Sequence, residues 1–213
     1  MADERLTAAR DLYERAVFNG DAEALTAAND QLDEVEADLA LARGRLMHAR
    51  FLTDRTEDPN ELLQFERAAT LYDRLGNIRG EAEACFWIGA YHQVVRQDGD
   101  TALPWLEKAY ELAERANDPL ALSYAARHLG FHAMESGDLA TARDLLEQSL
   151  QLRRKLDFRP GVAAALLALA EVTSRSGETE QAREFLAEAE AEATASGAEG
   201  VLSWIEQAPA ELP

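Results

Sequence analysis

Cysteine, proline and long apolar runs are all scarce in this chain of 213 residues. Cys85 is the single cysteine, so the chain forms no internal disulfide and no zinc site of paired cysteines, and its apolar neighbours indicate a buried structural thiol. No segment approaches the roughly 18 consecutive apolar residues that a membrane span needs, and the first residues contain no apolar run of signal length. The sequence therefore predicts a soluble, cytoplasmic protein with no membrane partner.

Basic residues are few as well. The chain has 21 Lys and Arg against 40 Asp and Glu, which gives a formal net charge of −19. Binding to nucleic acid requires a cluster of cations that displaces counterions from phosphates, so we expect no nucleic-acid partner. With six prolines, 7% aromatic residues, much alanine and few β-branched runs, the composition favours helix almost throughout.

Recognisable catalytic motifs are missing. The chain has no Gly-rich phosphate loop and no Gly-x-Ser-x-Gly elbow, and its carboxylates are so numerous that no acid–base pair stands out. His128 and His132 have the spacing that aligns two imidazoles on one helical face, but no third metal ligand is evident. We therefore expect no catalytic residues, no metal and no cofactor, and we expect His132 to be buried between helices.

What the chain does contain is an internal repeat. Residues 129–150 read as the end of one amphipathic helix, a turn at Gly137 and Asp138, and a second amphipathic helix. The same pattern returns about forty residues later, with Gly177 and Glu178 at the turn. A fixed period with two helices per unit predicts an all-α solenoid, in which no unit buries its apolar face alone.

The repeat has a recognisable consensus of small residues and turns. Its defining residues in the clearest copy are Leu129, Gly130, Gly137, Asp138, Ala142, Leu146 and Ser149. The pattern resembles the tetratricopeptide repeat (TPR), in the long-period variety of about 40 residues that is often found in bacterial regulators and signalling scaffolds. The resemblance is closest over residues 78–198. It implies a right-handed superhelix of antiparallel helix pairs.

Turn signals and the resemblance divide one predicted domain, residues 1–207, into successive units. These are a degenerate unit 2–36, the units 37–77, 78–118, 119–158 and 159–198, a capping helix 200–207 with Leu202, Trp204 and Ile205 covering the last face, and a disordered tail 208–213.

A regular apolar stripe runs through residues 21–55. Its largest members are Leu25, Leu32, Leu39 and Leu46. No turn signal interrupts the segment between Glu34 and Ala40, so we predict one long N-terminal helix rather than two short ones. Where the chain itself does not cover such a stripe, it can pair as a coiled coil, which makes a homodimer through residues 21–55 a hypothesis.

The resemblance also implies where a ligand would bind. In the family, the first helix of each unit lines a concave groove that holds a peptide or a segment of another protein. The corresponding positions, together with His128, give the predicted binding residues His48, Phe51, Phe86, Ala90, Gln93, Arg127, His128, Phe131, Met134, Glu171 and Arg175.

These residues are more apolar and aromatic than charged. Phe131 occupies a position where the family's carboxylate clamp uses Asn, so an apolar helix, strand or small molecule suits the groove better. We therefore predict a non-enzymatic interaction scaffold or regulatory adaptor that buries an apolar segment, with Arg127 and Arg175 fixing its orientation. The alternative is a small-molecule or metal sensor, or an enzyme, that uses His48, His128 or His132 in the same groove.

Overall fold

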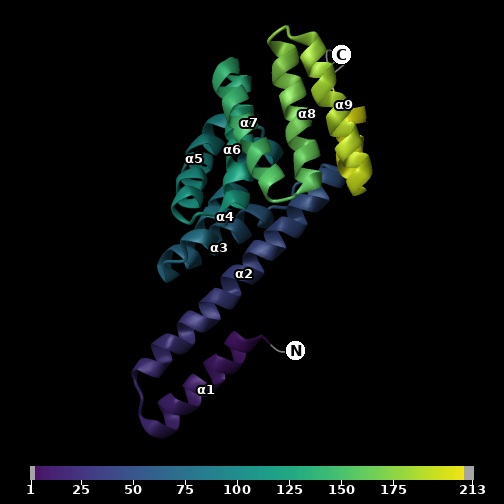
Figure 1. The fold of residues 1–213 in the computed structure, drawn as a ribbon. Coiled ribbons are helices and arrows are strands. Elements are labelled where there is room, and N and C mark those ends of the chain that lie inside the picture. The colour runs from purple at the N-terminus through teal and green to yellow at the C-terminus, as the bar shows by residue number, and fades with distance from the viewer. Residues whose placement is uncertain (1–2, 209–213) are drawn as a thin grey trace. The chain divides into compact units, whose positions relative to one another are not determined.

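The computed structural model describes residues 3–208, so residues 209–213 of the predicted tail lie outside the described part of the chain. Over residues 3–208 the chain forms ten α-helices and one short π-helix and contains no strand (Figure 1). This result confirms the predicted all-α helical-repeat fold. The chain divides into two compact units, Met1–Ala102 and Leu103–Pro213. The single domain and the right-handed superhelix stay predictions.

The first unit is a series of antiparallel neighbours. It contains α1 (Glu4–Asn19), α2 (Glu23–Asp54), α3 (Asn60–Leu75), α4 (Ile78–Ala90), the π-helix η1 (Tyr91–Val95) and the start of α5 (Gly99–Arg115). Each of the pairs α1–α2, α2–α3 and α3–α4 is in contact. Gly20 ends α1 in the left-handed conformation, and Asp21 accepts a hydrogen bond from Ala24 N at the start of α2.

Residues 23–54 form one long helix, α2, which confirms the predicted long N-terminal helix. Its central part lies very close to α3, because a Cβ atom on Gly44 would lie 2.4 Å from Cε1 of the buried Phe65. The residues of α2 that are buried are small apart from Leu41, His48 and Phe51. Small side chains thus let the two helices approach.

The large leucines of α2 are not part of this contact. Leu25, Leu32, Leu39 and Leu46 are between 45% and 63% exposed. The most regular apolar stripe in the sequence therefore lies on an uncovered side of the helix.

The second unit continues the hairpin pattern after α5. It contains α6 (Pro119–Glu135), α7 (Leu139–Lys155), α8 (Arg159–Arg175), α9 (Thr179–Ser196) and α10 (Glu199–Glu206). Its largest apolar cluster includes Leu146, Leu166 and Leu169, which are all fully buried. Gly130 of α6 lies directly against Leu146 of α7, so the consensus glycine serves close helix packing.

The turns of the second unit follow the sequence closely. Gly137 and Gly177 have φ values of 87° and 82°, a conformation that glycine adopts without strain. Asp138 Oδ1 accepts a hydrogen bond from Thr141 N at 3.1 Å and so caps α7.

One member of the predicted capping helix is placed differently. In α10 Val201 is buried, and Leu202 and Ile205 pack against the same apolar cluster, whereas Trp204 is 40% exposed and does not cover the last face. At the start of α5, Asp98 Oδ1 accepts a hydrogen bond from Thr101 N at 3.0 Å.

Candidate functional site

The predicted site residues of the first unit lie in a packed aromatic cluster. His48, Phe51 and Phe86 are all at least 92% buried. The imidazole of His48 lies edge-on to the Trp87 ring with centroids 5.2 Å apart, and Phe86 lies at 5.1 Å on another side of the same ring. These side chains hold α2 and α4 together and do not line an open surface.

His48 is also tied to α3. Its Nδ1 lies 2.7 Å from Oε1 of Glu61, a carboxylate that is fully buried. The pair makes His48 part of the helix interface rather than a free ligand.

The two remaining predicted residues of this unit lie at the end of α4. Ala90 is buried, and Gln93 is half-buried within η1. In η1 the Arg96 N–H donates to Tyr91 O at 3.2 Å, five residues back, which is the wider hydrogen-bonded ring of a π-turn. The structure thus leaves Gln93 as the partly accessible member of the first-unit set.

In the second unit, α6 presents its predicted residues on two sides. His128 and Met134 are buried, while Arg127 and Phe131 are partly exposed. The Arg127 guanidinium lies over the Phe131 ring, 4.4 Å from its centroid, in a cation–π contact. Arg127 and Phe131, both predicted binding residues, therefore contact each other on a partly exposed side of α6.

The neighbouring helix α8 supplies the other two residues. Arg175 Nη2 donates to Glu171 Oε1 at 2.7 Å, one turn apart on the same helix. Helices α6 and α8 are in contact, and Phe131 and Leu167 both pack at the edge of the main apolar cluster. Arg127, Phe131, Leu167, Glu171 and Arg175 are here called the α6–α8 face.

A buried cation beneath this face was not found from the sequence. Arg153 of α7 is 2% exposed, and its guanidinium donates to Gly161 O at 2.9 Å and lies over the Tyr124 ring at 4.9 Å. Its Nη2 has no hydrogen-bond partner. In the sequence Arg153 is one of three consecutive basic residues, which reads as a solvated helix end.

Arg153 affects the electrostatics of Arg127. Burial, assisted by the nearby charge of Arg153, lowers the pKa of Arg127 well below its ordinary value. The Nε of Arg127 has no hydrogen-bond partner, and the carboxylate of Glu171, which is close enough to favour the charged form, is bonded to Arg175. Arg127 is thus a cation whose charge is incompletely compensated.

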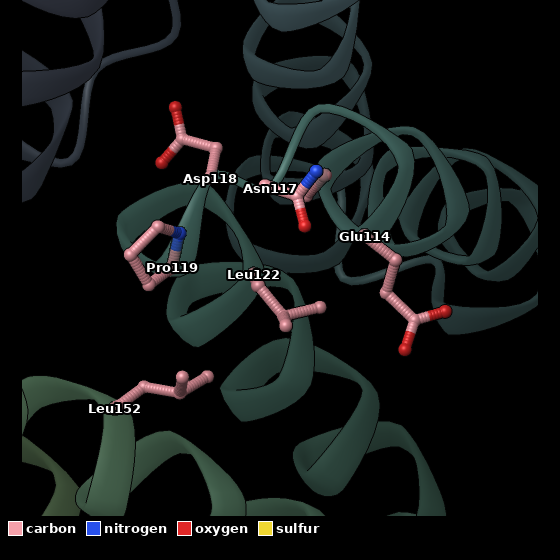
Figure 2. A pocket seen from close by; sticks show the side chains of 7 residues that line it. Glu114, Asn117, Asp118, Pro119, Leu122 and Leu152 are labelled. Atoms are coloured by element: carbon pink, nitrogen blue, oxygen red, sulfur yellow. The ribbon is translucent and has the colours of Figure 1, made fainter.

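A separate hollow of about 330 Å³ lies at the turn between α5 and α6. Its lining includes the apolar side chains of Leu122 and Leu152 and the carboxylates of Glu114 and Asp118 (Figure 2). The Asp118 carboxylate already caps α6 by accepting from Leu120 N and Ala121 N. None of the predicted site residues lines this hollow.

The histidines do not assemble a metal centre. His128 is buried with its ring 5.7 Å from Phe131, and His132 is half-buried rather than buried as expected. Within residues 3–208, no group of three or more His, Cys, Asp or Glu side chains could hold a metal ion. In the same range no helix is long and apolar enough to cross a membrane. The cytoplasmic location stays a prediction.

Comparison with known proteins bears on the two hairpins α6–α7 and α8–α9. The family model of the tetratricopeptide repeat matches residues 121–191. The match therefore includes most of both hairpins. The match begins in α6 and ends in α9, so it includes every residue of the α6–α8 face. No curated protein shows significant sequence similarity to the chain.

Several solved structures align with most of the chain at TM-scores below 0.5. BtubC (BKLC) from P. vanneervenii is 18% identical over 92% of this chain and 93% of that chain, with a TM-score of 0.49. A putative kinesin light chain from Podosopora anserina with nearly identical TPR-like repeats is 18% identical over 92% of this chain and 99% of that chain, with a TM-score of 0.42. Similarity at this level carries no argument about partners.

Proposed function

We propose that this protein is a non-enzymatic interaction module whose α6–α8 face binds a segment of another protein. The proposal is supported by the match of residues 121–191 to the tetratricopeptide repeat, because repeats of this family generally mediate interactions between proteins. The face combines partly exposed apolar groups, Phe131 and Leu167, with two cations. Apolar burial would supply affinity, and the cations would fix orientation.

The observation that carries the proposal is the state of Arg127. Its Nε is buried without a hydrogen-bond partner and its guanidinium lies over Phe131, while Arg175 is already paired with Glu171. A buried donor without a partner costs about 1–3 kcal/mol, and more when the group is charged. A carboxylate from a bound segment would remove that cost, so binding would favour a ligand that carries one.

The partner expected from this chemistry is a short apolar segment with an acidic side chain or a terminal carboxylate. The net charge of −19 makes a strongly acidic partner unfavourable at long range. A single carboxylate flanked by apolar residues satisfies both conditions, because it meets Arg127 locally without adding many negative charges.

A peptide array read out by fluorescence anisotropy tests the proposal. The purified full chain is expected to bind peptides with one carboxylate among apolar residues, and Phe131→Glu or Arg127→Glu is expected to weaken that binding at least tenfold. Arg183→Glu, which reverses an exposed cation on α9 outside the face, is the matched control and should leave affinity unchanged. Equal binding by Arg127→Glu and wild-type protein would contradict the proposal.

We also propose that residues 21–55 support self-association. The support is the exposure of Leu25, Leu32, Leu39 and Leu46 along α2. Light scattering of the full chain is expected to give twice the monomer mass at about 100 µM and the monomer mass on dilution. A monomer at every concentration would exclude self-association, whatever the peptide array shows for the α6–α8 face.

A further inference from the structure

The hairpin of α1 and α2 is covered on one side only. α1 runs antiparallel along the first half of α2 (Figure 1). Near the start of α1, Arg5 Nη1 donates a hydrogen bond to Asp38 Oδ2 of α2 at 2.6 Å. Ala9 of α1 and Ala24 and Ala28 of α2 are buried between the two helices. The hairpin thus has a small-residue seam and two outer sides.

One outer side is apolar on both helices. Its members are Leu6, Tyr13 and Val17 of α1 and Leu25, Leu32, Leu39 and Leu46 of α2, each at least 45% exposed. Successive residues of a helix are rotated by about 100° around its axis. On each helix the apolar residues are therefore rotated by roughly a quarter turn from the residues of the seam. The direction of this rotation is the same on both helices when each is viewed from its N-terminus. Because the helices are antiparallel, both sets fall on the same side of the hairpin, here called the leucine side.

The opposite side of α1 carries charge. Its members Glu4, Asp11 and Arg15 are exposed. Two antiparallel helices with one apolar side and one charged side have the form of half a four-helix bundle. Large contiguous apolar patches on soluble proteins mark interaction sites, so the leucine side calls for a partner.

The charge along α2 identifies that partner. Acidic residues Glu23, Asp30, Asp33, Glu34, Glu36 and Asp38 occupy its first half, which has no Lys or Arg. The second half carries Arg43, Arg45 and Arg50. A second copy of the same helix in antiparallel orientation places each acidic half beside a basic half, whereas a parallel copy places like charges together.

We infer that two copies of this chain pair through their leucine sides, with the two α2 helices antiparallel. The inference rests on the self-association proposed above and adds its surface, orientation and register. When Leu39 of each copy meets Ala42 of the other, Glu36 lies across from Arg43 of the second copy. Each central leucine then faces a smaller side chain, as close antiparallel packing requires.

Disruption of the leucine side is the first test. Leu32→Glu in the full chain is expected to raise the dimer dissociation constant at least a hundredfold in sedimentation equilibrium. Leu63→Glu is the matched control, since Leu63 is also an exposed leucine, at 57%, but lies on α3 away from this side. Both variants should keep the wild-type helical circular dichroism, because both sites are exposed. Equal dissociation constants for the two variants would overturn the inference.

Charge exchange tests the register. Glu36→Arg and Arg43→Glu alone are each expected to weaken dimerisation about three- to tenfold, and the double variant should recover most of the loss. Glu36 also accepts from Arg67 at 2.8 Å within the chain, so Arg67→Ala serves as the control for loss of that bond. A double variant that is weaker than both single variants would exclude this register.

A distance measurement tests the orientation. A spin label at Asn29→Cys, in a chain with the buried Cys85 replaced by Ala, is expected to lie about 35 Å from its equivalent in the second copy. A parallel dimer would give about 10 Å and would overturn the inference while self-association stood. A monomer at about 100 µM would overturn both. If the Arg127→Glu variant dimerises with the wild-type dissociation constant, the pairing is independent of the α6–α8 face.

Discussion

At the scale of single residues, the interior contains polar groups that each depend on one partner. His48 and Glu61 form a buried pair between α2 and α3, and Glu61 Oε2 has no hydrogen-bond partner. A carboxylate in this position is costly to desolvate and is tolerated because the imidazole meets it at 2.7 Å. The pair therefore ties the stability of this interface to both side chains together.

Replacing one residue of the His48–Glu61 pair should lower the free energy of unfolding more than replacing both. His48→Leu is expected to lower the free energy of unfolding by about 3–5 kcal/mol, because it leaves a buried carboxylate without a partner. The double variant His48→Leu with Glu61→Leu should recover a large part of that loss, since no charge remains to desolvate. Urea unfolding followed by circular dichroism measures both values. A double variant less stable than His48→Leu would show that the pair is not coupled in this way.

The same residues show how far sequence could define the site. The family positions on α6 and α8 fall on partly exposed groups at Arg127, Phe131 and Glu171 and on the exposed Arg175, and their role in binding stays a prediction. In the first unit they fell on core residues, because His48 and Phe86 pack against the Trp87 ring and Phe51 packs against His48. Periodicity identifies a helix face but not the neighbour that covers it. Arg153 was missed because a terminal basic run normally lies in solvent.

At the scale of helices, α2 shows why its packing side was hard to predict. The leucines spaced seven residues apart form the most regular apolar stripe of the sequence, and the structure leaves them exposed. The buried face instead uses Ala37, Ala40, Gly44 and other mostly small residues, because α3 approaches closely there. Helix boundaries were predictable from turn and cap residues, while the choice between two apolar faces depends on contacts distant in sequence.

The close approach of α2 and α3 can be measured at Gly44. Gly44→Ala is expected to reduce stability by about 1–3 kcal/mol, because the new Cβ would overlap the buried Phe65 ring. Gly200 is the matched control, since it lies in α10 with no atom within 4 Å of an added Cβ. Gly200→Ala should raise stability by up to about 1 kcal/mol through helix propensity. Equal effects of the two substitutions in thermal unfolding would contradict the packing argument.

At the scale of the whole molecule, the chain consists of helices that mostly contact their neighbours in sequence. Such arrays lose stability locally, because each hairpin depends on adjacent hairpins rather than on a shared centre. The two compact units, residues 1–102 and 103–213, make that behaviour testable within one protein.

A destabilising substitution in the core of one unit should leave the amide hydrogens of the other unit protected from exchange. Leu146→Ala removes a fully buried side chain from the second unit and is expected to cost about 2–5 kcal/mol there. Native-state hydrogen exchange should therefore show faster exchange in α6–α9 with little change in α2 and α3. An equal loss of protection in both units would indicate a single cooperative structure instead.

The π-turn at the end of α4 has a consequence for evolution by insertion. One residue more separates the starts of α4 and α6 than the starts of α6 and α8, which lie at Ile78, Pro119 and Arg159. The wide ring closed by Arg96 N and Tyr91 O holds one residue more than an α-helical ring. A chain lacking Gln93 should therefore regain an ordinary helix there and still fold. Helical arrays of this kind can accommodate the insertion of one residue within a helical turn, without lengthening a loop.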